Sequence, residues 1–370
     1  MAHNTGPYLL FFPYLPIQGS YKLGPWRLGP LKGYTGSWLS PAFERQSRAF
    51  MASFRDAGGK PLDNMYVLSH GERGMDGRLP TRPQQTALQR AVDFAVLDNN
   101  PPLDSDNAGL GAATADNAEL FIWPIDVTGG RVTLSRGSMV RTMAGGHRIN
   151  DELRVPAPLE LQMPLWTFSL DAELLAAMYN LFTRRLAGSN DLDRRRIEVA
   201  VGWLSKAWRN SPSVSMADRV VFLKTGFEAL SDESKTKPCA DWLRSLYEKE
   251  LAGNIPKYTR HVLWSSAEKP VRTYKYKLSG NVVGQLTELQ HWFMSFGEAR
   301  NAIVHEGTTP RLLYKLSKSR YNSSMVNVGE RLLRESIKVK MISLGYPNLW
   351  RTPLWRAIDR RLHKATHRNK

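Results

Sequence analysis

The chain has little of what marks a secreted or membrane-spanning protein. It has one cysteine in 370 residues, Cys239, so an internal disulfide and a zinc site built from several cysteines are both excluded. Its longest early apolar run, residues 8–17, is interrupted by two prolines and is about half the length of a membrane span. A secretory signal would require a basic segment before this run, and no Lys or Arg precedes it. We therefore expect a cytoplasmic protein and no membrane partner.

The absence of internal repeats and of a phosphate-binding loop motif excludes further classes of protein. No period of 20–50 residues repeats, so a solenoid or propeller is not supported. No Gly-x4-Gly-Lys-Ser/Thr motif is present, so nucleotide hydrolysis has no support, and we expect no cofactor and no metal. The hydrophobic fraction of 42% and the charged fraction of 23% are those of a globular protein, and the length favours two domains.

Positive charge is abundant and unevenly placed. The chain has 51 Lys or Arg and 34 Asp or Glu, a formal net charge of +17. Residues 311–370 contain 15 Lys or Arg and 3 Asp or Glu, so +12 of this charge lies in the last sixty residues. Such an asymmetry predicts a polyanionic partner, first nucleic acid and second an anionic membrane surface, the alternative being a solubilising face.

The hydrophobic pattern predicts an α+β protein with a change of texture near residue 168. Residues 1–168 read as a β-rich domain: alternating segments at 119–127 and 131–135 flank a Gly-Gly turn, and one helix covers 84–97. Residues 169–345 read as an all-α bundle, and residues 346–370 as a basic amphipathic tail. The predicted bundle helices lie at 171–186, 194–208, 216–230, 240–248, 282–305 and 328–344.

The helix ending at His305 carries an anomaly. Its apolar stripe has Arg300 where a leucine is expected, and a guanidinium there needs either a paired acid or a groove that admits an anion. Asn301 and His305 share one face at i and i+4, whereas Arg300 and His305 are about 140° apart around an ideal helix. His305 lies in the last turn before Gly307, where the helix dipole favours an imidazolium that can donate a proton.

The segment Arg300-Asn301-Ala302-Ile303-Val304-His305-Glu306-Gly307 resembles the Arg-Asn-x-x-x-His signature of the HEPN superfamily, in particular its Apea-like branch. The stretch 218–230, with Phe227-Glu228-Ala229-Leu230, resembles the earlier helix that faces the signature helix in that family. The flanking helices at 197–208 and 329–345 are similar as well. The resemblance covers roughly residues 169–345 and leaves the N-terminal part outside.

The resemblance implies a metal-independent endoribonuclease, active as a homodimer, of a kind that serves as a toxin or an anti-phage effector. By position, His305 is the acid and base, Arg300 stabilises the phosphorane and Asn301 orients. Glu228 is a weaker catalytic candidate, a partner of Arg300 or Asn301 or else a packing carboxylate. The alternative function is a non-catalytic HEPN module that binds RNA or regulates. A regulatory or antitoxin partner stays unidentified.

The tail has a pattern of its own. Its basic residues alternate with tryptophans, which suits phosphate contact combined with base stacking. A membrane-surface helix would look similar, and a helix packed on the bundle is the plainer alternative. The candidate RNA-binding residues of the tail are Trp355, Arg356, Arg360, Arg361 and Lys364.

Overall fold

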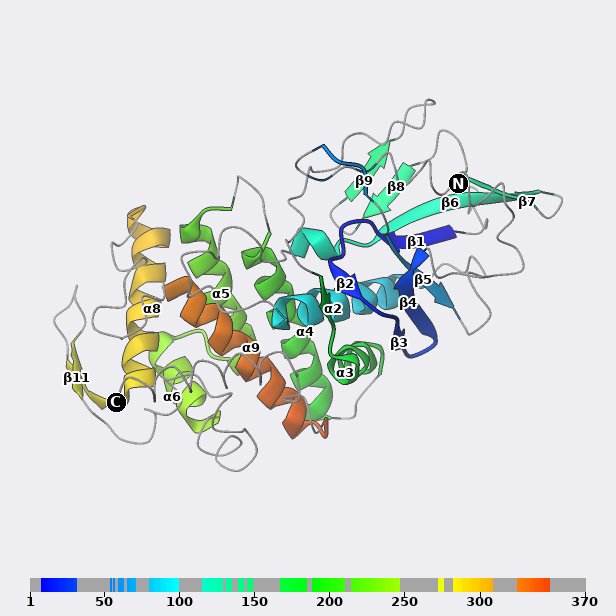
Figure 1. The fold of residues 1–370 in the computed structure, drawn as a ribbon. Helices are drawn as coiled ribbons and strands as arrows, with labels where there is room; N and C mark the ends of the chain where they lie inside the picture. Colours follow the sequence, from blue (N-terminus) through cyan, green and yellow to red (C-terminus); the bar gives the residue numbers. More distant parts are fainter. Residues whose placement is uncertain are drawn as a thin grey trace, which may run out of the picture. The chain divides into compact units, whose positions relative to one another are not determined.

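The computed structural model is a mixed α+β protein of two compact units, which divide the chain near residue 184 (Figure 1). The coarse fold class expected from the hydrophobic pattern is therefore confirmed. The residues described are 8–31, 54, 56, 59–62, 65–70, 80–99, 115–128, 131–134, 139–142, 145–148, 167–184, 188–209, 214–246, 272–275, 282–308 and 325–346.

The first unit is built on an antiparallel sheet. Its described strands follow the order β3-β4-β5-β1-β6-β8-β9, with β7 paired to β6. Both alternating segments of the sequence form strands, β6 and β7, and these pair with each other in the hairpin that the sequence predicted. The strands are β1 (Tyr8–Phe12), β3 (Tyr21–Leu23), β4 (Trp26–Pro30), β5 (Tyr66–His70), β6 (Phe121–Thr128), β7 (Arg131–Leu134), β8 (Met139–Thr142) and β9 (Gly145–Arg148). Two short strands, β2 (Ile17–Gln18) and β10 (Phe168–Ser169), form a separate parallel pair.

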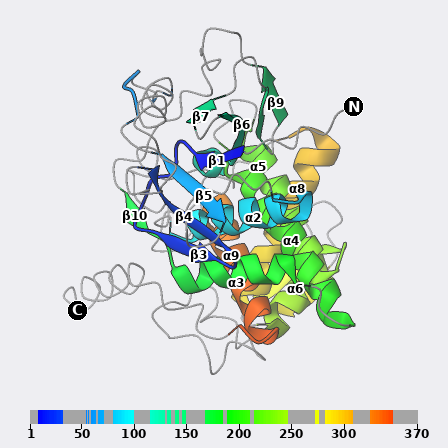
Figure 2. The same ribbon diagram turned by 90° about the vertical axis from the view of Figure 1, so that its right-hand side faces the viewer.

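Two α-helices, with a short 3-10 helix η2 (Ala115–Ala118), complete the first unit. Helix α2 (Arg82–Asp98) begins with a capping box at Thr81 and buries nearly every residue of its second half. Its Gln89 accepts the N–H of Leu120 at 2.8 Å and donates to the carbonyl of Ala118 at 2.6 Å, which fastens the helix to the segment that enters β6. Helix α3 (Ala172–Thr183) packs against α2 and beside β3 (Figure 2). The sequence pattern assigned this helix to the bundle, whereas the compact unit that contains it is the first.

The second unit contains the remaining described α-helices. They are α4 (Ser189–Ala207), α5 (Met216–Ser231), α6 (Thr236–Leu246), α8 (Glu288–Glu306) and α9 (Met325–Ser343). Two boundaries differ from the expectation. Residues 189–191, predicted to be a turn, form the first turn of α4, where Asp191 lies near the positive helix end and binds Arg194 at 2.9 Å. Residues Val282–Leu286, predicted to be helical, form strand β12, which pairs with β11 (Arg272–Lys275).

The core of the second unit is aromatic where α5 meets α8. The ring of Phe227 meets that of Phe293 edge to face, with centroids 5.1 Å apart, and both side chains are fully buried. On another side of α8, the helix approaches α6 closely at Gly297, where a Cβ atom would lie 2.3 Å from the side-chain methyl of Thr236. Gln290 also donates to Asp241 at 2.6 Å, so α6 fixes the position of α8 from a second side.

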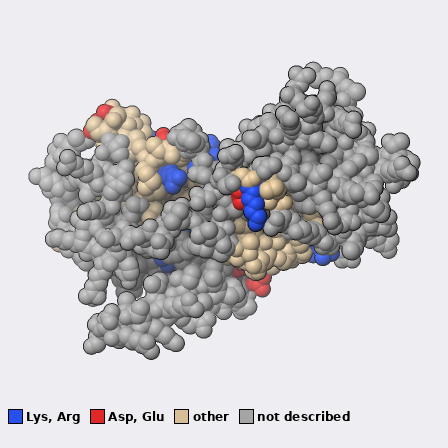
Figure 3. Space-filling model, turned by 45° about the horizontal axis from the view of Figure 1, so that its top comes forward, with Lys and Arg blue, Asp and Glu red and all other residues tan. Residues whose placement is uncertain are grey.

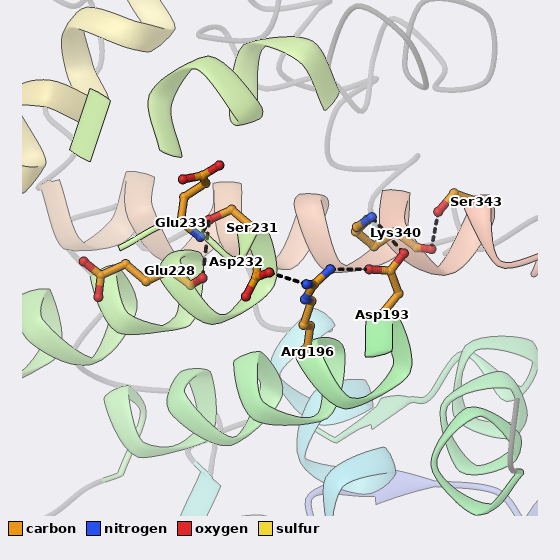
Figure 4. A network of polar contacts seen from close by, with 8 residues as sticks. All are labelled: Asp193, Arg196, Glu228, Ser231, Asp232, Glu233, Lys340 and Ser343. Carbon is orange, nitrogen blue, oxygen red and sulfur yellow. Dashed lines mark hydrogen bonds and ion pairs between the residues drawn. The ribbon is translucent and has the colours of Figure 1, made fainter. Parts of the chain in front are cut away.

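A chain of ion pairs joins three helices of the second unit (Figure 4). Asp193 of α4 accepts from Lys340 of α9 and from Arg196, each at 3.1 Å. Arg196 also binds Asp232, which caps α5 in the left-handed region at a φ of 64°. Because each pair is partly exposed, this network fixes the orientation of the helices more than it adds to stability.

None of the helices in the described part of the chain combines the length and the hydropathy that a membrane span needs.

Candidate active site

Helix α8 places the Arg-Asn-x-x-x-His segment. It begins at Thr287, whose hydroxyl accepts from the Gln290 N–H at 3.2 Å while the Gln290 side chain accepts from the Thr287 N–H at 3.1 Å. This reciprocal cap stabilises the first turn. The helix then buries one face, including Trp292 and Phe296, whose rings are stacked 5.0 Å apart. The buried residues of α8 end at Ala299, directly before Arg300.

The last turn of α8 is held by its C-terminal cap. Gly307 adopts a φ of 64°, in the left-handed region that favours glycine, and its N–H donates to the carbonyl of Ala302. The N–H of Thr308 donates to the same carbonyl at 3.2 Å. These bonds end the helix at Glu306, before the glycine at which the sequence predicted its stop, and fix the turn that carries His305.

The three signature residues lie at an open helix end. Asn301 and His305 are exposed, Arg300 is half-buried, and Val304 between them exposes 47% of its surface. The Arg300 Nη1 donates to the Asn301 Oδ1 at 3.2 Å, so the structure brings these two residues together. His305 stands one turn further along, within reach of solvent.

Among the described residues, Arg300 has no acid partner of the kind that one interpretation of its position required. Its Nε atom is buried and has no hydrogen-bond partner among the described residues. A buried guanidinium N–H without an acceptor is costly in free energy, and a planar cation of this kind suits a phosphate. The other interpretation, a side chain that awaits an anion, therefore agrees better with the geometry.

The structure does not place Glu228 in contact with Arg300 or Asn301. Its carboxylate accepts from the ammonium of Lys224 at 2.8 Å, within α5, and no bond joins it to Arg300 or Asn301. Lys224 is 1% exposed, and its Nζ lies 5.3 Å from the centroid of the Phe293 ring. Since a buried ammonium requires a counter-charge, Glu228 is committed to neutralising Lys224.

Sequence reasoning missed the buried ammonium of Lys224. The signal was present, because Lys224 lies next to the apolar stripe of α5 and has a carboxylate at i+4. Surface i,i+4 pairs look the same in a sequence, so only the packing of Phe293 above the pair distinguishes a buried pair from an exposed one.

Other candidate groups contribute no chemistry to the described site. Burial raises the pKa of the Cys239 thiol to about 11, so this cysteine is protonated at neutral pH and unsuited to nucleophilic attack. Within the described residues, no group of three or more His, Cys, Asp or Glu is placed to hold a metal ion. The five tail candidates, from Trp355 to Lys364, lie outside the described residues.

Comparisons with known proteins add no relative. No family model, no curated protein and no solved structure matches the chain.

Proposed function

We propose that the protein is a metal-independent endoribonuclease of the HEPN type that acts in the cytoplasm. One observation carries the proposal. A half-buried guanidinium, Arg300, has no acid partner among the described residues, bonds to Asn301 and lies within two helical turns of the exposed His305. The resemblance of this segment to the HEPN signature supplies the substrate class, RNA.

These residue types suit cleavage through the ribose 2′-hydroxyl. The 2′-oxygen bonds to phosphorus as its proton passes to a base, and the bond from phosphorus to the 5′-oxygen breaks as that oxygen receives a proton. An imidazole can perform both proton transfers. Arg300 stabilises the charge on the phosphorane, and Asn301 orients the guanidinium through its bond at 3.2 Å.

A homodimer resolves the geometry that a single helix leaves incomplete. On one helix Arg300 and His305 are about 140° apart, so one chain directs them to different sides. A two-fold axis beside the end of α8 would bring both pairs to one groove. The exposed Val304, flanked by the half-buried Ile303, offers an apolar contact at that place.

The dimer is tested by dilution and by substitution. We expect specific activity to fall when the protein is diluted below its dimer dissociation constant. We expect Val304→Asp to yield a folded, inactive monomer, because burying a carboxylate in the dimer contact costs free energy that an exposed carboxylate does not. Analytical ultracentrifugation and a cleavage assay measure both. Leu192→Asp, at a 54% exposed leucine of α4, is the matched control and should remain dimeric. A fully active monomer would contradict the composite site.

The second test asks whether cleavage requires a metal ion. Cleavage of total RNA should persist in excess chelator, and the products should carry 2′,3′-cyclic phosphate and 5′-hydroxyl ends. The reason is the donor set, since Arg300, Asn301 and His305 together offer one good metal ligand. End-group analysis by mass spectrometry and labelling reads the outcome. Loss of activity in chelator with recovery in magnesium would contradict this mechanism.

A further inference from the structure

A group of aromatic rings and cations lies where α4 ends and α5 begins. The rings of Trp203 and Phe222 are 5.7 Å apart between centroids, at an interplanar angle of 31°. Lys206 places its Nζ 3.9 Å from the centroid of Trp203, and Arg219 places its guanidinium carbon 5.6 Å from that of Trp208. We call these five residues the basic–aromatic cluster.

The cluster is accessible. Trp203, Phe222 and Arg219 are half-buried, Lys206 is exposed and only Trp208 is buried. Aromatic side chains that are kept partly in water, beside cations, are arranged for contact with something other than the core of the bundle.

The cations of the cluster are not neutralised within the described residues. The Arg219 Nε is buried and has no hydrogen-bond partner there, and burial lowers the pKa of this guanidinium from its ordinary value. The neighbouring Asp218 is engaged by the cap of α5, where it accepts from the Ser215 N–H at 2.8 Å and from its hydroxyl at 2.6 Å. A desolvated guanidinium without an acid favours a bound anion.

The cluster lies at the same end of the bundle as the candidate active site. Leu223 of α5 and Phe296 of α8 meet at Gly329, where a Cβ would lie 3.6 Å from one and 3.2 Å from the other. Phe227 contacts Phe293, so residue numbers rise along α5 as they fall along α8. One turn beyond Leu223 and Phe296 stand Arg219 and Arg300. Figures 1 and 2 both show the start of α5 beside the end of α8.

We infer that the basic–aromatic cluster binds the nucleotides that flank the scissile phosphodiester of single-stranded RNA. Arg219 and Lys206 hold phosphates and Trp203 stacks on a base. The assignment rests on the proposed ribonuclease function, and it names the strand form of the substrate and a surface beyond the signature residues.

The chemistry of the cluster favours a single strand of nucleic acid over other polyanions. Every base offers a flat face to an aromatic ring, whereas an acidic peptide or a duplex does not. Lys206 covers the indole of Trp203, so a base that takes its place frees the ammonium for the adjoining phosphate. Figure 3 shows Lys and Arg atoms, with some Asp and Glu atoms, among the uncharged atoms of the described surface on that side of the molecule.

The test measures binding without cleavage. A fluorescein-labelled, mixed-sequence single-stranded RNA is titrated with the full chain in a His305→Ala background, and the dissociation constant is recorded by anisotropy over a range of salt. We expect Trp203→Leu to weaken binding by roughly tenfold, since stacking is lost. Lys206→Ala and Arg219→Ala should each lower the log–log salt slope by about 0.7. Because Lys206 is exposed, its variant tests the idea without loss of fold.

A control of equal charge comes from the same helix. Arg195→Ala removes a cation whose side chain is 67% exposed and pairs with Asp191 at the far end of α4, and it should change neither affinity nor slope. Wild-type affinity and slope in all three cluster variants would overturn the inference while leaving the ribonuclease intact. Equal affinity for poly-glutamate would overturn it too. Weakened binding in these variants, together with a wild type that never cleaves RNA, would contradict the proposed ribonuclease function and support the basic–aromatic cluster as an RNA-binding surface.

Discussion

Replacing His305 or Arg300 with alanine is expected to lower the rate of RNA cleavage by about 10²- to 10⁴-fold. General acid and base transfer by one side chain contributes about 10² to 10⁴ in rate, and one preorganised charge donor contributes about 10² to 10³. The measurement is the initial rate on a labelled RNA. A second readout is growth on expression, since an active ribonuclease arrests cells and the His305→Ala variant should not.

Stability separates loss of chemistry from loss of fold in this experiment. His305 is exposed, so His305→Ala should leave the melting temperature unchanged. Glu306→Gln, in the same exposed turn, is the matched control and should keep wild-type activity. Arg300→Lys keeps the charge but loses the planar fork and should recover only part of the rate. An undiminished rate in His305→Ala would leave the non-catalytic RNA-binding module as the function.

Glu228→Leu is expected to destabilise the protein by about 3 kcal/mol, because it leaves the ammonium of Lys224 buried without a counter-charge. Phe293 closes the space above this ammonium, so the charge cannot reach water without disturbing the contact of α5 with α8. Urea denaturation, with an unchanged m-value, measures the difference.

A double variant decides whether Glu228 has a second role. Lys224→Met combined with Glu228→Leu removes both charges and should recover most of the lost stability, since an apolar pair of similar size fits a buried site. If Glu228 serves only Lys224, the double variant also cleaves RNA at the wild-type rate. A stable double variant with no activity would return Glu228 to the catalytic machinery.

Elements with a strong period were predictable from the sequence because local forces decide them. The stripe of Leu174, Met178 and Leu181 is fully buried on α3, and the residues from Met216 to Leu230 form one helix with a capping box at Ser215. The end of α8 at Gly307 followed from the conformational freedom of glycine. These signals act within one or two turns of the chain.

Two segments were assigned the wrong secondary structure. Residues 282–286 have an apolar pattern that fits a helix, yet they pair with 272–275, because for a short apolar segment the cross-strand contacts decide between strand and helix. The first turn of α4 depends on Asp191, which binds two arginines of the same helix and outweighs the turn propensity of its neighbours.

The sequence by itself determined that Arg300, Asn301 and His305 share the last turns of an amphipathic helix, because helical spacing and the glycine cap are local properties. Only the tertiary structure decided which charges are satisfied. Packing against Phe293 buried Lys224 and thereby engaged Glu228, while Arg300 and Arg219 each kept a buried N–H without an acceptor among the described residues. Desolvation depends on what covers a side chain, and what covers it comes from other helices.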